Sequence, residues 1–419
     1  MGPGAVALLC GARLATRSAD THYTFRQDSD FHYLTGFDHP HAAAVLRTDG
    51  SPAFTLYVEP RQPEAEIWTG FRPGVEGAVR DHGADAAHPI DDLLGQVPKL
   101  LEGAQRLFVV LGRDPALDAK LIETIDQMRL RSRTSVVPPS EIVDPRAILH
   151  EMRLFKEAAE VEIMRRAAAI SCAAHRATAP GARAGRFEYE LEAMLDYHFR
   201  KRGASGPAYG SIVGGGANAT VLHYVANRAR LREGDLVLID AGCELEGYAS
   251  DVTRTYPVGG SFEGPGGAIY QVVLEAQEAA LAVAKPGATL EDVHAAAVRK
   301  LTEGMVSLGL LSGDVDGLIE SSAYKPYYMH RTSHWLGLDV HDVGAYTRDG
   351  HPRVLEPGMV LTVEPGLYVS AYDEKSDPRL HGIGVRIEDD VLVTEDGHEN
   401  LTAAIAKRPR DVEAWVAGT

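Results

Sequence analysis

The sequence predicts an α+β protein of two domains, an α/β domain over residues 1–150 and a second domain over residues 151–419. In the first part, short apolar runs alternate with helical candidates, which is typical of an α/β domain with a mixed or parallel sheet. Three prolines, the last of them Pro145, then interrupt the local structure, and a long pattern of helical period follows. We therefore place the domain junction near Glu151.

The first domain is predicted to contain several short strands and at least two helices. The apolar runs predict strands at residues 5–9, 42–46, 53–58 and 107–111, and the helical candidates are residues 91–101 and 115–130. We interpret the first run as a buried strand rather than a signal peptide, because no positive charge precedes it and Leu9 stands where a lipoprotein cleavage site needs a small residue. Trp68 lies in EIWTGFRPG, whose glycine and proline signals predict a loop, and its composition alone favours plain packing.

The second domain combines longer helices with separated strands. Helical periodicity covers residues 158–178, 186–202, 267–284 and 290–308, and strand-like runs cover residues 236–239, 360–363, 385–387 and 391–393. This combination predicts an α+β layer in which helices cover one face of a curved sheet.

The composition limits the classes of partner. A formal net charge of -17 without any basic run disfavours nucleic acid, since the long-range field repels phosphate groups. The three cysteines are far apart in sequence and indicate no disulfide framework, which fits a reducing cytoplasm. No run of about 18 apolar residues occurs, so we expect a cytoplasmic protein without a membrane span.

The first chemical signal is a pair of aspartates in LVLIDAGCELEGYASD. A buried strand ends on Asp240, and Asp251 follows after a segment that Gly247 and alternating polarity mark as a hairpin turn. If the two halves pair antiparallel, both carboxylates converge on one point, where their repulsion calls for a cation.

Three further carboxylate or imidazole signals follow. HRTSHWLGLDVHD contains His330, His334 and His341, VLTVEPG carries Glu364 at the end of an apolar run, and GVRIEDD carries Glu388. Two divalent ions would balance the charge of the four acidic residues beside one neutral imidazole. Two metals about 3.5–4 Å apart can activate a bridging water for attack on a polarised carbonyl or phosphoryl group.

Each of these residues also has an ordinary structural explanation. A strand-end aspartate is more often a cap than a ligand, and a lone histidine is usually a surface or satisfied core residue. Five such residues in order along the chain, on or next to the expected strands, favour a metal centre. The segment IVGGGANAT, residues 212–220, lacks the context of a phosphate-binding loop, so we expect a tight turn that carries His223 to the site.

These motifs resemble the proline-specific metallopeptidases of the pita-bread fold, the Xaa-Pro aminopeptidases (aminopeptidase P) and the prolidases. The resemblance rests on DAGCELEGYASDVTRTYPV, HRTSHWLGLDVHDVG, VLTVEPGLY and GIGVRIEDDVLVTEDGHENLT, while RQDSDFHYLTGF and EIWTGFRPG look like the N-terminal domain of bacterial aminopeptidase P. It implies an N-terminal α/β creatinase-like domain, with roles in oligomerisation and substrate access, followed by a C-terminal pita-bread catalytic domain. Bacterial members usually begin with a helix, whereas this chain starts almost at its first strand.

The resemblance also implies roles for individual residues. The metal ligands would be Asp240 and Asp251 for one ion, His334 and Glu364 for the other, with Asp251 and Glu388 bridging both. His223 and His341 would hold the scissile carbonyl and stabilise the tetrahedral intermediate, and Glu364 would move the proton of the attacking water. The proline pocket would consist of His330, Tyr368 and Arg386, with Trp68 added from a neighbouring subunit. Tyr368 could instead be core packing, and Arg386 a salt bridge that orients Glu388.

We therefore expect a metal-dependent aminopeptidase that releases the N-terminal residue from peptides with proline in second position, through a metal-bridging hydroxide. Oxygen-rich ligation favours Mn(II), with Zn(II) and Co(II) as alternatives. Two other functions remain open: a prolidase that cleaves only Xaa-Pro dipeptides, and a pita-bread binding protein without catalysis. The family further implies peptide substrates and a homo-oligomer, either a dimer or a tetramer.

Overall fold

The structure is a computed structural model that describes residues 1–131 and 136–419. The chain divides into two compact units, Met1–His150 and Glu151–Thr419. Each unit has its own hydrophobic cores. Among the described helices, none combines the length and the apolar character needed to cross a bilayer.

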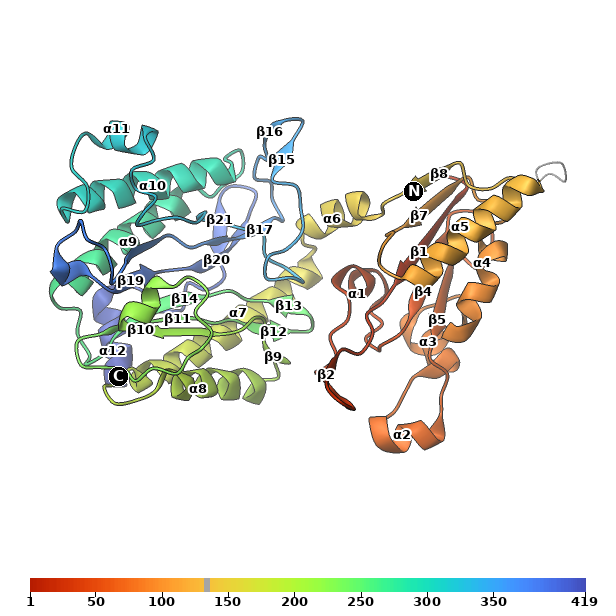
Figure 1. The fold of residues 1–419 in the computed structure, drawn as a ribbon, viewed down its shortest axis with the longest axis horizontal. Helices are drawn as coiled ribbons and strands as arrows, with labels where there is room; N and C mark the ends of the chain where they lie inside the picture. Colours follow the sequence, from red (N-terminus) through yellow and green to blue (C-terminus); the bar gives the residue numbers. More distant parts are fainter. Residues whose placement is uncertain (132–135) are drawn as a thin grey trace. The chain divides into compact units, whose positions relative to one another are not determined.

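A six-stranded mixed sheet forms the centre of the first unit (Figure 1). In spatial order its strands are β6 (Ala86–Pro89), β5 (Phe54–Val58), β4 (Ala43–Arg47), β1 (Ala5–Cys10), β7 (Arg106–Val109) and β8 (Glu141–Val143). β1 pairs antiparallel with β4 and parallel with β7. The sheet confirms the predicted α/β class, and the four predicted strands are present with small shifts at their ends.

Both faces of this sheet are buried because successive side chains of a strand point to opposite faces. Val6 and Leu8 of β1 belong to one core, and Ala7 and Leu9 belong to the other. The helices of this part of the chain are α1 (Ser29–Thr35), α2 (Pro63–Thr69), α3 (Gly74–His82), α4 (Leu93–Leu101), α5 (Pro115–Leu130) and α6 (Arg146–Leu154). A short hairpin is formed by β2 (Thr16–Ser18) and β3 (Thr21–His22). The helix predicted at residues 91–101 begins as a 3-10 turn, Ile90–Asp92, before α4.

The loop prediction for Trp68 was wrong, because this residue lies in helix α2. Pro63 stands at the start of α2, where a missing N–H costs nothing, and Gly70 ends the helix. The packing interpretation of Trp68 also fails within this chain, since its side chain is 88% exposed. The glycine and proline signals marked the two ends of a short helix rather than a continuous loop.

The second unit contains several small antiparallel sheets. Their strands are β10 (Ile212–Gly215), β11 (Leu236–Asp240) and β14 (Thr253–Pro257); β9 (Gly206–Pro207), β12 (Cys243–Leu245) and β13 (Tyr248–Ala249); β17 (Val360–Val363), β20 (Asp389–Val393) and β21 (His398–Asn400); β18 (Gly366–Val369) and β19 (Ile383–Arg386); and β15 (Thr347–Arg348) with β16 (His351–Pro352). All four strands predicted here are present.

Long helices flank these strands (Figure 1). The helices are α7 (Ala158–Thr178), α8 (Glu188–Lys201), α9 (Gly264–Val283), α10 (Leu290–Ser307), α11 (Val315–Glu320) and α12 (Pro409–Ala417). Side chains of α7 and α8 share a core with β11 and β14, whereas those of α9 and α10 share cores with β17, β19 and β20. The second unit therefore has two halves, each a set of strands with its own pair of long helices.

The predicted hairpin turn between the two aspartates is confirmed. β12 and β13 pair antiparallel with Leu245 opposite Tyr248, so the loop has two residues. Glu246 and Gly247 both have positive φ, 52° and 87°. Positive φ at both central residues is what a type I′ hairpin turn requires, and glycine supplies it without strain.

Candidate metal centre

The strand register brings the two aspartates together. Asp240, the last residue of β11, lies directly opposite Thr253 of β14. Asp251 precedes Thr253 by two residues, and residues two apart along an extended chain point to the same face. Both carboxylates therefore fall on one face of the sheet, where both side chains are buried.

Strand register also brings two glutamates together in the half of the unit that contains β17 and β20. Val363 of β17 lies opposite Asp389 of β20, so the next pair along this register is Glu364 and Glu388. The backbone N–H of Glu388 donates to the carbonyl of Thr253 at 3.0 Å. The two halves of the unit thus meet where the four carboxylates lie.

His334 comes from a segment that runs beside β17. The N–H of Thr362 donates to the His334 carbonyl at 3.0 Å, and the N–H of Glu364 donates to the Thr332 carbonyl at 2.8 Å. Nδ1 of His334 lies 2.9 Å from the carbonyl of Trp335, which fixes the proton on this nitrogen in the neutral ring. The lone pair of Nε2 is then directed toward the carboxylates, as in a metal-binding imidazole.

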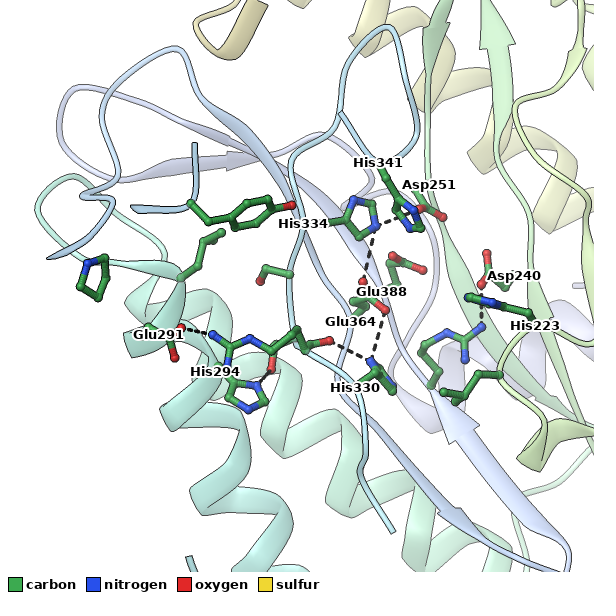
Figure 2. Close-up of a pocket in the computed structure, with 18 of the residues that line it drawn as sticks. His223, Asp240, Asp251, Glu291, His294, His330, His334, His341, Glu364 and Glu388 are labelled. Atoms are coloured by element: carbon green, nitrogen blue, oxygen red, sulfur yellow. Dashed lines mark hydrogen bonds and ion pairs between the residues drawn. The ribbon is translucent and has the colours of Figure 1, made fainter. Parts of the chain in front are cut away.

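These groups form a compact cluster (Figure 2). One ligand atom from each of Asp251, His334 and Glu388 lies within 4.8 Å of the others. Nε2 of His334 is 3.4 Å from Asp251 and 3.5 Å from Glu364. Asp240 completes the set through Tyr209, whose hydroxyl lies 2.6 Å from Asp240 and 2.5 Å from Asp251. The five ligands expected from sequence are therefore close together.

Burial and mutual repulsion perturb the acidic groups. Burial, reinforced by Asp251, raises the pKa of Glu364 to about 7, although His334 and Arg386 act in the opposite direction. Burial and the charges of Asp251 and Glu364 raise the pKa of Glu388 well above its usual range, and burial also raises that of Asp240. Asp251 is the exception: burial raises its pKa, but the hydrogen bond and charge of His334 outweigh this and lower it. Divalent cations bound among these carboxylates would offset their mutual repulsion.

The pKa of His334 is also shifted, in the direction that favours the charged imidazole. Burial lowers its pKa, but the hydrogen bond to Asp251 and the charges of Glu364 and Asp251 outweigh burial and raise the pKa to about 9. The imidazole therefore holds a proton at neutral pH in the metal-free protein. A metal ion must displace this proton before Nε2 can serve as a ligand.

Two residues that the sequence analysis did not identify, Tyr209 and Thr253, hold the carboxylates in place through hydrogen bonds. Tyr209 donates to the aspartate pair, and burial raises the pKa of its hydroxyl well above the usual value, so it remains a donor. Thr253 donates its hydroxyl proton to Glu388 at 2.6 Å. Tyr209 lies in an irregular segment before β10, so no periodic pattern identifies it. Its two partners, Asp240 and Asp251, are 31 and 42 residues away in sequence.

His330, Tyr368 and Arg386 form a connected group next to the carboxylates. His330 Nε2 lies 2.9 Å from the Tyr368 hydroxyl, which also accepts from Arg386 at 3.0 Å. Arg386 donates to Asp240 at 2.6 Å, so the alternative that it forms a salt bridge to Glu388 was wrong. Burial and the charge of Arg386 lower the pKa of His330 to about 3, and its 3.6 Å contact with Glu364 is therefore not an ion pair at neutral pH.

His341 lies against the cluster from a firmly held loop. Its ring is 4.4 Å from that of His334, and burial followed by the charge of His334 lowers its pKa. The next residue, Asp342, is buried and pairs with Arg153 at 2.5 Å and Lys156 at 2.9 Å. These two ion pairs fix the backbone that presents His341.

His223 follows the 3-10 turn Gly216–Thr220 and lies on the opposite side of the cluster from the His334 segment in Figure 2. The segment 212–220 forms β10 and this turn rather than a strand followed by a long helix. His223 lines the same cavity as His341 and all five candidate ligands. Trp68 is not among the residues that line this cavity.

The cavity has a volume of about 670 Å³, which lies within the range of about 300–1,000 Å³ typical of small-ligand sites. It is lined by Leu222, His223, Asp240, Asp251, Leu290, Glu291, His294, His330, Arg331, Thr332, Ser333, His334, His341, Tyr346, Thr347, Pro352, Glu364, Arg386 and Glu388. The carboxylate cluster thus forms part of the wall of a space large enough for a short peptide.

Comparison with known proteins identifies the family. The model of the aminopeptidase P N-terminal domain matches residues 1–109, and that of metallopeptidase family M24 matches residues 162–395. The Xaa-Pro aminopeptidase of Escherichia coli (strain K12) is 45% identical over 416 residues, 99% of this chain and 94% of the relative. The structure of Pseudomonas aeruginosa aminopeptidase PepP has a TM-score of 0.97 at 48% identity and covers 100% of this chain and 95% of that one. Zn-substituted Escherichia coli aminopeptidase P in complex with product has a TM-score of 0.96 at 44% identity, with coverage of 100% and 95%. The chain therefore belongs to metallopeptidase family M24, in its aminopeptidase P branch, as the sequence motifs predicted.

Proposed function

We propose that this protein is a metal-dependent exopeptidase that releases the N-terminal residue from peptides with proline in second position. The observation that carries the proposal is the convergence of three buried carboxylates, the partly buried Glu364 and one imidazole on the wall of a peptide-sized cavity. The family membership supports the same reaction class. A proline amide nitrogen has no hydrogen, which explains why its hydrolysis needs a dedicated enzyme.

The donor set suits two divalent ions. Asp240 and Asp251 would hold one ion, His334 and Glu364 the other, and Asp251 and Glu388 would bridge them. Oxygen-rich ligation with one imidazole favours Mn(II), with Zn(II) and Co(II) as alternatives. The ions would supply a Lewis acid and a nucleophile at neutral pH.

The protein's own groups would handle the remaining tasks. His223 and His341 would orient the scissile carbonyl and donate hydrogen bonds to the oxygen on which charge develops. Glu364, whose pKa of about 7 in the metal-free protein reflects its burial, is suited to accept a proton and pass it to the leaving nitrogen. The loop anchored by Asp342 would keep His341 at a constant position.

The proline ring would pack against the cavity side of His330, a flat and largely apolar wall that the buried Tyr368 supports through its hydroxyl, 2.9 Å from Nε2 of His330. Arg386 would position this wall, because its guanidinium already donates to Asp240, Tyr368 and Thr253. The aminopeptidase is favoured over the prolidase because relatives that match 99% of this chain bear the name Xaa-Pro aminopeptidase. A non-catalytic binding protein is disfavoured, since such relatives typically lack ligands that this cluster retains.

The proposal for assembly rests on the resemblance to the family and on one exposed surface. Trp68, with Ile67 and Phe71, forms an apolar group on and just beyond α2, with exposed fractions of 88%, 80% and 63%. We propose that the protein is a cytoplasmic homo-oligomer, a dimer or a tetramer, in which Trp68 reaches the proline pocket of a neighbouring subunit. The N-terminal domain would thereby contribute to both oligomerisation and substrate access.

The decisive test compares two substrates before and after metal removal. The chelator-treated protein should cleave neither Ala-Pro-Ala nor Ala-Pro, and added Mn(II) should restore cleavage of the tripeptide more than that of the dipeptide. Undiminished hydrolysis by the metal-free protein would refute the mechanism. Restoration of dipeptide cleavage alone would identify a prolidase.

A further inference from the structure

The cavity extends well beyond the carboxylate cluster and the proline pocket. In Figure 2, Glu291 and His294 lie on the opposite side of the cavity from Asp240 and His223, with His330 between them. Tyr346 and Pro352 line the cavity as well. A peptide that continues after its proline would therefore meet a further part of the same cavity rather than open solvent.

The described residues that line this cavity include two arginines, and their surroundings differ. Arg386 is buried, and its guanidinium donates to three side chains of the site. Arg331 forms an ion pair with Glu291, and these two side chains are 59% and 53% exposed. Exposed ion pairs contribute little net stability, so a substrate carboxylate can replace Glu291 at small cost.

The other groups near Arg331 do not compete for an anion. His294 has its Nδ1 2.8 Å from the hydroxyl of Thr332. Burial and the charge of Arg331 lower the pKa of His294 to about 4, so this ring is neutral at pH 7. Lys325 also acts on His294 but is not among the residues that line the cavity, so Arg331 is the cation that lines this end of it. Arg331 follows His330 of the proposed proline wall directly in sequence.

We propose that Arg331 binds the free C-terminal carboxylate of short substrates that carry a residue after proline, and that Glu291 is its partner in the unliganded protein. This inference rests on the proposed function and adds the recognition of the far end of the substrate. A guanidinium and a carboxylate form a charge-assisted, often bidentate pair, which suits this ligand better than any neutral group would. Because the pair lies away from the scissile bond, it should act on binding rather than on the chemical step.

The test compares Ala-Pro-Ala with its C-terminal amide, Ala-Pro-Ala-NH2, on the Mn(II)-loaded enzyme. The wild type should prefer the free acid in kcat/KM by several-fold to about tenfold, with most of the difference in KM. Arg331→Gln should bring this ratio close to one without changing kcat for the amide. Glu291→Gln should increase the ratio, because it removes the competing carboxylate.

Arg299→Gln is the matched control. Arg299 lies on α10, as Glu291 does, and forms an exposed ion pair with Asp316 of α11, outside the cavity-lining set. Its substitution removes the same charge as Arg331→Gln and should leave the ratio unchanged. An unchanged ratio in Arg331→Gln, or an equal rise of KM for acid and amide, would overturn the inference alone. Failure of the wild type to cleave either peptide would instead overturn the proposed function and this inference with it.

Discussion

Glu364→Gln should make the metal-free protein more stable at alkaline pH while removing its activity. The pKa of Glu364 is raised from 4.5 to about 7, first by burial and then by neighbouring aspartates. The raised pKa costs nothing below about pH 4.5, where the carboxyl is protonated in both the folded and the unfolded state; the cost grows as pH rises from there and is complete above about 7. Glutamine stays neutral throughout and avoids this cost.

The magnitude follows from the pKa change. A shift from 4.5 to about 7 corresponds to about 3 kcal/mol, at about 1.4 kcal/mol per pH unit. In a folding unit of this size, such a change moves Tm by roughly 5–10 °C. The gain should be largest at pH 8 and above and should shrink toward zero as pH falls toward 4.5.

The assay is thermal or urea unfolding of chelator-treated protein at pH 5, 6.5 and 8. Glu278→Gln is the control, because it removes the same charge at an exposed residue of α9 outside the cavity-lining set. When Mn(II) is added, the wild type should regain stability by mass action and the variant much less. A metal-free Glu364→Gln protein that is no more stable than the wild type at pH 8 would refute the electrostatic reasoning.

Two further predictions concern the cluster and the exposed tryptophan. Asp251→Asn should abolish turnover and reduce bound metal, measured by elemental analysis, while circular dichroism shows the fold retained; full activity would mean that the bridging role is misassigned. Trp68→Ala should raise KM for tripeptides and longer substrates more than it lowers kcat, because the residue would contact substrate from another subunit; kinetics equal to those of the wild type would remove Trp68 from the substrate site.

The sequence predicted the regular parts of this protein well because their signals are periodic. The helix predicted at residues 158–178 appears as α7 with the same bounds, and the strand that ends on Asp240 appears as β11. Asp240 and Glu364 could be singled out because each ends an apolar run, and Asp251 because it follows a predicted hairpin turn. The convergence of Asp240 and Asp251 followed from the predicted hairpin, whereas the full ligand set was implied by the resemblance to the family.

The partners of these residues could not be predicted in the same way. Tyr209 and the Asp342 cluster depend on pairings between segments far apart in sequence, and the contact of Arg386 with Asp240 spans 146 residues. A local pattern carries no information on which of two nearby carboxylates an arginine will reach. Trp68 was misplaced for a different reason: glycine and proline near the ends of a seven-residue helix give the same signal as a loop.

The dependence of the site on strand register has a consequence for how this sequence can change over time. Because side chains alternate with a period of two, inserting or deleting one residue within β11 or β17 would rotate Asp240 or Glu364 to the opposite face. Length variation should therefore be excluded from these strands and accumulate in surface connections such as residues 259–261, between β14 and α9. Among descendants of this gene, gaps in an alignment should avoid the ligand-bearing strands even where individual apolar residues are exchanged freely.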